Sequence, residues 1–264
     1  MNYIYPTTLS NHWNDIYLMI YENYRHDLND SDLLIIGCCA YHNIKDLKEM
    51  YPGYERYVVY QLEPLTSNHY WYDANKIIER ICDADEVWDY DLDNLEVLKQ
   101  NGISAKFKPF VYAESLKRIQ NQEEPDIDVL FYGSLTDSRL KILSDISERT
   151  LYTPFMILTH TDGVQLDEYI GRSKIIIDLH TEGDNDIQKQ SRIYYALINN
   201  KCVISQKSKR NYFGDLIIEP QEDFCADLLY TLESGNWKNY SQNTSEKFKL
   251  HSKNLISNYA LFNS

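Results

Sequence analysis

The sequence predicts an α/β protein in which parallel strands alternate with helices. Apolar, β-branched runs of strand length recur along the chain, for example Leu33–Cys39 and Ile175–Leu179. Stretches with helical spacing lie between such runs, as in 71–83. Strand-helix alternation at short intervals favours parallel sheets. A polar segment at 120–126, broken by Pro125, separates two stretches of this alternation.

The first half begins with a buried strand and ends before the polar segment. Asp91 is a helix-capping residue type, and Asn101-Gly102 is typical of a helix end. We expect strands at 33–39, 57–62, 86–88 and 104–110, and helices at 71–83 and 91–101.

The second half repeats the pattern after residue 126. Thr136 or Asp137 can cap its first helix. We expect strands at 128–134, 155–158, 175–179, 202–205 and 216–218, and helices at 138–149, 165–172, from about 187 to 198, 223–232 and 244–261. The predicted domains are 1–120, 126–243 and a C-terminal helix at 244–264.

Charge limits the classes of partner. The chain has 264 residues, and 26 Lys and Arg against 40 Asp and Glu give a formal net charge of −14. An acidic surface repels phosphate backbones and anionic lipid. We therefore expect no nucleic-acid partner, although a local basic cleft could override the global sign. Mid-chain candidates for such a patch are Lys106, Lys108, Lys117 and Arg118.

The cysteine content and the hydropathy of the sequence indicate the cellular compartment in which the protein is expected. The chain has five cysteines, an odd number, and no C-x-x-C pair, which fits reduced thiols better than disulfides or a zinc site. Its first residues lack the basic start and apolar core of a signal peptide. No apolar run approaches the roughly 20 residues that span a bilayer. We expect a cytoplasmic protein without a membrane span.

Several polar residues follow predicted strands, where open α/β sheets bind ligands. Gly133-Ser134 closes a strand and opens a helix, a place where phosphate can approach the backbone, or else a plain turn. Arg139 in the first turn could add a contact to a diphosphate. No full G-x-G-x-x-G or G-x-x-x-x-G-K-[ST] occurs, which disfavours dinucleotide and P-loop proteins.

The segment 172–205 forms a strand-loop-helix-strand unit with further candidates. His180 and Glu182 lie in the loop after the strand, and Arg192 lies on the helix that follows. They could bind sugar hydroxyls and phosphate, or could be an ordinary loop histidine, a solvated acid and a salt-bridged arginine. Lys174 precedes the strand and is either a phosphate partner or a solvent-facing lysine.

Candidates in the first half follow the strand 57–62. Glu63 ends that strand before Pro64, and His69 and Trp71 follow in a loop. Glu63 could be a general base, and Trp71 a stacking platform for a sugar. The structural alternatives are a helix-capping glutamate and a core tryptophan.

Taken in order, these motifs resemble a known family. They are Tyr60–Glu63, Trp71, Ala84–Asp91 with Asn94, Val129–Ser134, Ser173–His180 and Arg192–Ser205. Together they resemble small glycosyltransferases of the GT-B fold, in the spore-maturation-like group of bacteria, large DNA viruses and phages. The resemblance covers about Leu33 to Ser205.

The resemblance implies two Rossmann-like domains with a cleft between them and a C-terminal helix that crosses back to the first domain. It implies a nucleotide-sugar donor held mainly by the C-terminal domain, an acceptor held by the N-terminal domain, and no metal or other cofactor. Donor contacts would fall on Gly133, Ser134, Arg139, Lys174, His180 and Arg192. Glu63 or His69 would be the base of an inverting reaction, and Trp71 would contact the acceptor.

One position departs from the family pattern. Relatives in that family carry a ribose-binding Glu three residues before the arginine, where this chain has Lys189. Glu182 is the candidate to take its place. The expected function is transfer of a hexosyl or pentosyl group from a nucleotide-diphosphate sugar to an acceptor hydroxyl. The alternatives are a non-catalytic nucleotide- or nucleotide-sugar-binding module of the same fold, and a phage-type enzyme that glycosylates modified bases in DNA.

Overall fold

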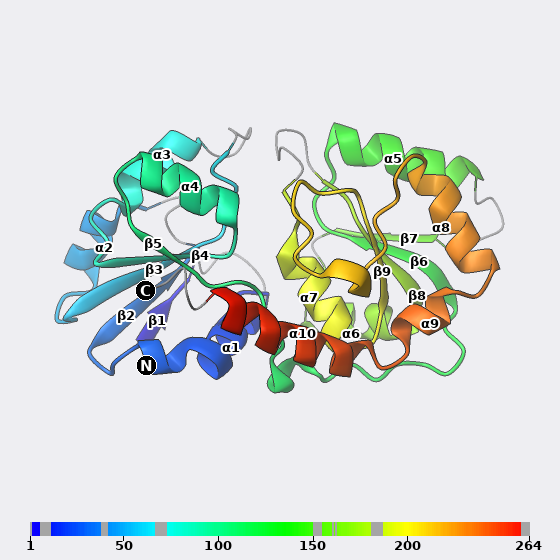
Figure 1. Ribbon diagram of the computed structural model, residues 1–264, viewed down its shortest axis with the longest axis horizontal. Coiled ribbons are helices and arrows are strands. Elements are labelled where there is room, and N and C mark those ends of the chain that lie inside the picture. The colour runs from blue at the N-terminus through cyan, green and yellow to red at the C-terminus, as the bar shows by residue number, and fades with distance from the viewer. Residues whose placement is uncertain are drawn as a thin grey trace. The chain divides into compact units, whose positions relative to one another are not determined.

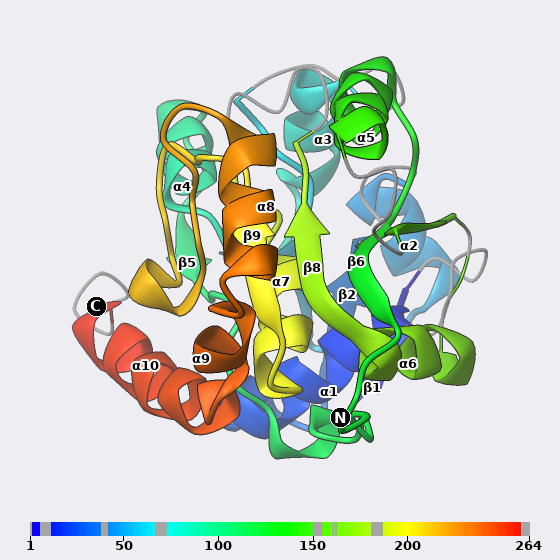
Figure 2. The same cartoon turned by 90° about the vertical axis from the view of Figure 1, so that its right-hand side faces the viewer.

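The protein is described by a computed structural model over residues 2–5, 12–37, 42–66, 73–149, 155–159, 161, 163–180 and 187–259, without the side chains of His12, Trp13 and Tyr259. The chain forms two compact units (Figures 1 and 2). The first comprises residues 1–110 and 253–264, and the second comprises residues 111–252.

The first unit contains a five-stranded sheet in the order β1-β2-β3-β4-β5, and every neighbouring pair is parallel. Its strands are β1 (Asn2–Ile4), β2 (Asp32–Ile36), β3 (Arg56–Gln61), β4 (Glu86–Asp89) and β5 (Ala105–Phe107). Strands β2 and β3 are buried on both faces, which explains their continuous apolar sequence.

Helices cover both faces of this sheet. They are α1 (His12–Tyr24), the short 3₁₀ helix η1 (Arg25–Asp27), α2 (Ile44–Met50), α3 (Ala74–Ile81) and α4 (Leu92–Gln100). Helices α2, α3 and α4 pack on the face that carries Leu33, Ile35 and Val59. Helix α1 covers the other face, where the Tyr24 ring contacts Trp88 edge-on with centroids 6.3 Å apart.

The second unit contains a four-stranded parallel sheet in the order β7-β6-β8-β9. Its strands are β6 (Ile127–Tyr132), β7 (Phe155–Leu158), β8 (Ser173–Asp178) and β9 (Cys202–Ser205). Strand β8 lies between β6 and β9, and Ile175, Ile176 and Ile177 are fully buried. The isoleucine run therefore forms the centre of the sheet.

Helices of the second unit also lie on both faces of its sheet. They are α5 (Asp137–Arg149), α6 (Gly163–Arg172), α7 (Gln190–Ile198), α8 (Phe224–Glu233) and α9 (Trp237–Ser241), with the 3₁₀ helices η3 (Glu114–Leu116) and η4 (Gly214–Leu216). The last helix, α10 (Thr244–Tyr259), begins in the second unit and continues past the division at 252/253. Helices α5 and α8 lie side by side and pack on the face of Val129, Ile175 and Ile204 (Figures 1 and 2). No described helix is long and apolar enough to cross a membrane.

Most expected elements are present, with one correction. Residues 216–218 do not form a strand: Leu216 ends η4, and Ile218 makes a single bridge to Ile204. Pairing stops there because Pro220 lacks the N–H that a continuing ladder needs. Elements β1, α1, α2 and α9 were not expected from the pattern.

The polar segment 120–126 lies inside the second unit, and the division between the units falls at 110/111. Asn199, at the end of α7, holds the start of this segment: its side-chain oxygen accepts from the backbone N–H groups of Arg118 and Ile119, at 3.1 and 3.0 Å. The backbone N–H of Gln122 donates to the Gly171 carbonyl at 3.1 Å. Although its sequence is polar and contains a proline, the segment is held in one conformation because its backbone groups are hydrogen-bonded.

Candidate functional site

Polar residues gather at the carboxyl ends of β6, β8 and β9 in the second unit. Because these strands are parallel, Gly133, Leu179 and Gln206 follow them at the same edge of the sheet. Gln206 joins two of the loops: its N–H donates to the Asp178 carbonyl at 3.0 Å, and its side-chain oxygen accepts from the His180 N–H at 2.7 Å. We call this the donor edge, after the donor contacts that the family resemblance predicts for residues here.

Arg192, in the first turn of α7, is the main cation of the donor edge. Its Nη1 pairs with a carboxylate oxygen of Asp178, which is fully buried, and Ser205 Oγ donates to the other oxygen at 3.2 Å. The guanidinium lies 5.3 and 5.4 Å from the ring centroids of Phe131 and Tyr132. Its Nε is buried and has no hydrogen-bond partner among the described residues. The charge is held in place, and one donor is unused.

Gly133 explains why Arg192 can lie so close to the end of β6. Its φ is +140°, in the region that favours glycine. A Cβ at this position would lie 2.5 Å from Nη2 of Arg192. The glycine therefore makes room for the guanidinium.

Arg139 is predicted to contact the donor, and the structure shows it as a bridge between two loops. It is 3% exposed, and its Nε and Nη2 donate to the Leu179 carbonyl at 3.0 and 2.8 Å. Its Nη1 donates to Ser134, at 2.9 Å to the carbonyl and 3.1 Å to Oγ. It thus positions Ser134 against the loop after β8.

The N-terminus of α7 lies at the same edge. Lys189 occupies the N-cap and makes no side-chain cap hydrogen bond. Its neighbour Gln188 is 1% exposed and accepts from the Tyr212 N–H at 2.9 Å, so the entry to the helix is fixed. A helix N-terminus presents N–H groups and the positive end of the helix dipole, both of which favour an anion.

His180 lies in the loop after β8 and is 8% exposed. Its Nε2 is 3.4 Å from Ser208 Oγ, and its backbone is held by Gln206. It belongs to the donor edge, whereas Glu182 lies outside the described residues.

Lys174 is not brought to the donor edge. It lies at the opposite end of β8, where its ammonium pairs with Asp128. Lys174 and Asp178 are four residue steps apart in an extended strand, a distance of about 13 Å. A lysine that is near in sequence is far in space because the intervening residues form a strand.

In the first unit, Glu63 lies just after β3, at the carboxyl edge of that sheet. Its N–H donates to the side-chain oxygen of Gln61 at 2.6 Å, and its carbonyl accepts from Asn94 Nδ2 at 3.0 Å. His69 and Trp71 lie outside the described residues. The structure thus fixes the backbone of Glu63 at the place the sequence predicts.

A buried carboxylate underlies this loop. Asp89, at the end of β4, accepts from Asn94 Nδ2 and Gln61 Nε2, at 3.1 and 3.2 Å, and from the Asp91 N–H at 2.8 Å. Complete burial raises the pKa of Asp89 well above its ordinary value, against the opposing effect of these hydrogen bonds.

Sequence reasoning assigned no role to the residues that support these edges, above all Asp178, Ser205 and Gln206 in the second unit and Asp89 and Asn94 in the first, although all but Gln206 lie in the motifs that carry the resemblance. One signal in the sequence could have indicated such residues: an acid at the end of an apolar run, as in Ile175–Asp178. An acid at the end of a buried strand needs a hydrogen-bond or ion-pair partner. No group of at least three His, Cys, Asp or Glu side chains that could hold a metal ion occurs in the described part of the chain.

Comparison with known proteins gives a structural likeness only. No protein-family model and no curated protein matches the chain. The solved structure of TarM is similar, with 10% identity, 94% of this chain and 58% of TarM covered, and a TM-score of 0.58. A Gap123 glycosylation-associated complex from Streptococcus agalactiae matches with 11% identity, coverages of 94% and 58%, and a TM-score of 0.48. The rhamnosyltransferase SpnG with thymidine diphosphate matches with 9% identity, coverages of 94% and 78%, and a TM-score of 0.43.

The likeness to TarM shows the fold. That fold is GT-B, and the predicted class, α/β with two parallel-sheet units of this type, is confirmed. This chain spans about 58% of the length of TarM.

Proposed function

We propose that this protein is a glycosyltransferase that moves a sugar from a nucleotide-diphosphate donor to an acceptor hydroxyl, without a metal ion. Its GT-B-like fold supports the class. The donor edge supports the site, because it combines a helix N-terminus with a fixed cation at the carboxyl ends of parallel strands.

The unused Nε of Arg192 carries the proposal. A buried donor without a partner costs free energy, of order 1–3 kcal/mol, and a bound anion would satisfy it. Asp178 already balances the single positive charge of Arg192, so the α7 N-terminus must supply further stabilisation of a diphosphate. Ser134 Oγ accepts from Arg139, which leaves its own proton to donate to a phosphate oxygen.

In this proposal the diphosphate is the leaving group. Negative charge grows on it as the bond to the sugar breaks, and donors fixed beforehand stabilise that charge most effectively. His180 and Glu182 would bind the sugar or ribose hydroxyls. Glu63 or His69 would accept the acceptor's proton if the reaction inverts configuration, and Trp71 would stack on the acceptor.

Nucleoside diphosphates test the donor edge directly. We expect millimolar UDP, GDP, ADP or TDP to raise the melting temperature, because a ligand that binds only the folded state stabilises it by mass action. The double variant Arg192→Gln/Asp178→Asn should lose the shift. It removes both charges together, so no unpaired charge remains buried.

Lys174→Ala is the matched control, since it removes a cation from the other end of β8 and should keep the shift. The absence of a shift with all four nucleotides, or a shift that depends on Lys174 instead of Arg192, would contradict the proposal.

A second candidate is a non-catalytic module that binds a nucleotide or nucleotide sugar. Lys189 favours it, because a lysine at the α7 N-cap cannot accept hydrogen bonds from ribose hydroxyls as a glutamate would. Donor hydrolysis or sugar transfer by the wild type, absent in Arg192→Gln/Asp178→Asn, would exclude the module. A nucleotide-induced shift without either reaction would favour it.

A further inference from the structure

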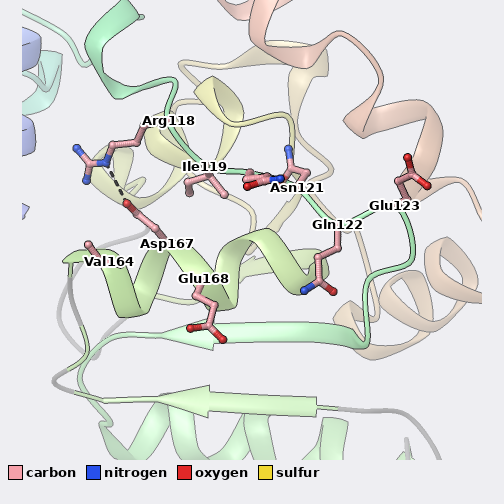
Figure 3. A pocket seen from close by; sticks show the side chains of 9 residues that line it. Arg118, Ile119, Asn121, Gln122, Glu123, Val164, Asp167 and Glu168 are labelled. Carbon is pink, nitrogen blue, oxygen red and sulfur yellow. Dashed lines mark hydrogen bonds and ion pairs between the residues drawn. The ribbon is translucent and has the colours of Figure 1, made fainter.

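A hollow of about 950 Å³ opens in the second unit. Figure 3 shows the side chains that line it. The segment 118–123 and the first half of α6 form its lining. Its volume falls in the upper part of the range of about 300–1,000 Å³ typical of small-molecule sites. Asn199, which holds the lining segment, lies one residue past the end of α7, whereas the donor edge is at the start of that helix, about 13 Å along its axis.

The wall of the hollow is held in a fixed geometry. The Asn199 side chain accepts from two backbone N–H groups of the lining segment and donates to the Leu116 carbonyl at 3.0 Å. Asn121 Nδ2 donates to the Asn199 carbonyl at 2.8 Å. Gly171 lets α6 approach, since a Cβ there would lie 2.6 Å from the Gln120 carbonyl oxygen. A ligand would meet a preformed surface.

The charged residues at one side of the hollow are paired. Arg118 Nε donates to an Asp167 carboxylate oxygen at 3.0 Å, and Figure 3 shows this contact. The other Asp167 oxygen accepts from the Tyr195 hydroxyl, and Glu168 pairs with Arg172 at 3.4 Å. Arg172 also donates to both carboxylate oxygens of Asp126, at 2.9 and 2.7 Å, so the hollow keeps a weak negative charge and disfavours an anionic ligand.

The groups that remain available are mostly amides. Within the described part of the chain, the side chains of Gln120, Gln122 and Glu123 line the hollow without a hydrogen-bond or ion-pair partner. Each amide offers two N–H donors and one carbonyl acceptor. A hydroxyl group, which both donates and accepts, complements such a surface. A cation would find the carboxylates of Glu123 and Glu168, both of which are exposed and screened by water, and a phosphate would be repelled by them.

We propose that the hollow binds a neutral oligosaccharide at a site separate from the donor edge. The exposed aliphatic surface of Val164 and the partly exposed Ile119 would contact the C–H faces of sugar rings, while the amides bind their hydroxyls. The proposal goes beyond the donor-edge function and does not depend on it.

Saturation-transfer NMR with maltohexaose and chitohexaose, each at millimolar concentration, tests the proposal on the whole protein. We expect saturable binding of at least one of them, weakened about tenfold in Gln120→Ala/Gln122→Ala, because two amide hydrogen bonds are worth roughly 1.4 kcal/mol together. Gln165→Ala, an exposed glutamine of α6 outside the lining, should bind like the wild type.

Four outcomes would overturn the proposal. The first is no binding of either oligosaccharide. The second is equal binding by the wild type and the double variant. The third is displacement of the oligosaccharide by UDP, which would place the sugar at the donor edge. The fourth is binding of spermine in place of both oligosaccharides, which would make the hollow a cation site. Surface Gln→Ala changes alter stability by about 0.5 kcal/mol or less, so loss of binding would not reflect unfolding.

Discussion

At the scale of single residues, the donor edge depends on a glycine, a buried acid and an arginine. Asp178 is fully buried and holds Arg192, and Gly133 leaves the space into which the guanidinium fits. Breaking a buried ion pair on one side costs about 3–5 kcal/mol, so each partner depends on the other. The geometry of the cation is thus set by Gly133 and Asp178 together.

Gly133→Ala tests this dependence. The new Cβ would push Arg192 away from Asp178 and would force an L side chain to a φ of +140°, for a cost of about 1–3 kcal/mol. We expect a lower free energy of unfolding in urea and loss of the UDP-induced rise in melting temperature. Gly102→Ala is the control, because Gly102 also has a positive φ, +76°, but a Cβ there meets nothing within 4 Å. If both variants kept the UDP shift, Gly133 would have no role at the donor edge.

At the scale of elements, helix α7 connects the features described above. Arg192 lies in its first turn, and Asn199 caps its other end and holds the segment 118–121. Lys201 follows, is 3% exposed, and donates to the carbonyls of Gly171 and Ser173 at 3.1 and 2.9 Å. These contacts join the end of α6, the start of β8 and the end of α7.

Lys201 predicts a dependence of stability on pH. Burial lowers its pKa to about 7 in the folded protein, from 10.5 in the unfolded chain. Between these values the unfolded state binds the extra proton, so stability rises with pH; below about pH 7 both states are protonated and the penalty is constant. We expect the free energy of unfolding of the wild type to increase by about 2 kcal/mol from pH 7 to 9 relative to Lys201→Met. Lys99→Met, at an exposed site, should follow the wild type. Parallel pH profiles for wild type and Lys201→Met would contradict the prediction.

The sequence predicted most of the strands and helices because their apolar runs are buried on both faces and their ends carry capping residues. Asp91 is an example: it caps α4 by accepting from the N–H groups of Asp93 and Asn94. Short elements such as β1, with three half-exposed or exposed residues, lack that signal. The site was predicted in part. One edge of the sheet carries Gly133, Ser134, His180 and Arg192. Lys174 lies at the opposite edge, because the extended residues of β8 place it far from Asp178 although the two are close in sequence.

At the scale of the whole molecule, the two parallel-sheet units belong to a GT-B-like fold. The likeness to TarM covers 94% of this chain but 58% of TarM, at 10% identity, so it transfers the fold and not the substrate. The narrower resemblance to the spore-maturation-like, viral and phage group stays a prediction. The acceptor also stays a prediction. In the first unit, Glu63 is the described residue that is predicted to take the acceptor's proton.

The net charge of the protein argues against DNA as the acceptor and in favour of a small molecule or a glycan. With a formal charge of −14, the molecule repels a polyanion, and phosphate neutralisation by Lys and Arg dominates DNA affinity. All four mid-chain basic candidates are also paired: Lys106 with Glu86 at 2.8 Å, Lys117 with Glu246 at 2.9 Å, Arg118 with Asp167 at 3.0 Å, and Lys108 with Asp27. We expect the protein to pass through a column of immobilised duplex DNA at low ionic strength without retention. A basic DNA-binding protein on the same column is the control. Retention that falls steeply with added salt would show a local basic surface strong enough to override the global charge, and would favour the DNA-modifying alternative over a small-molecule or glycan acceptor.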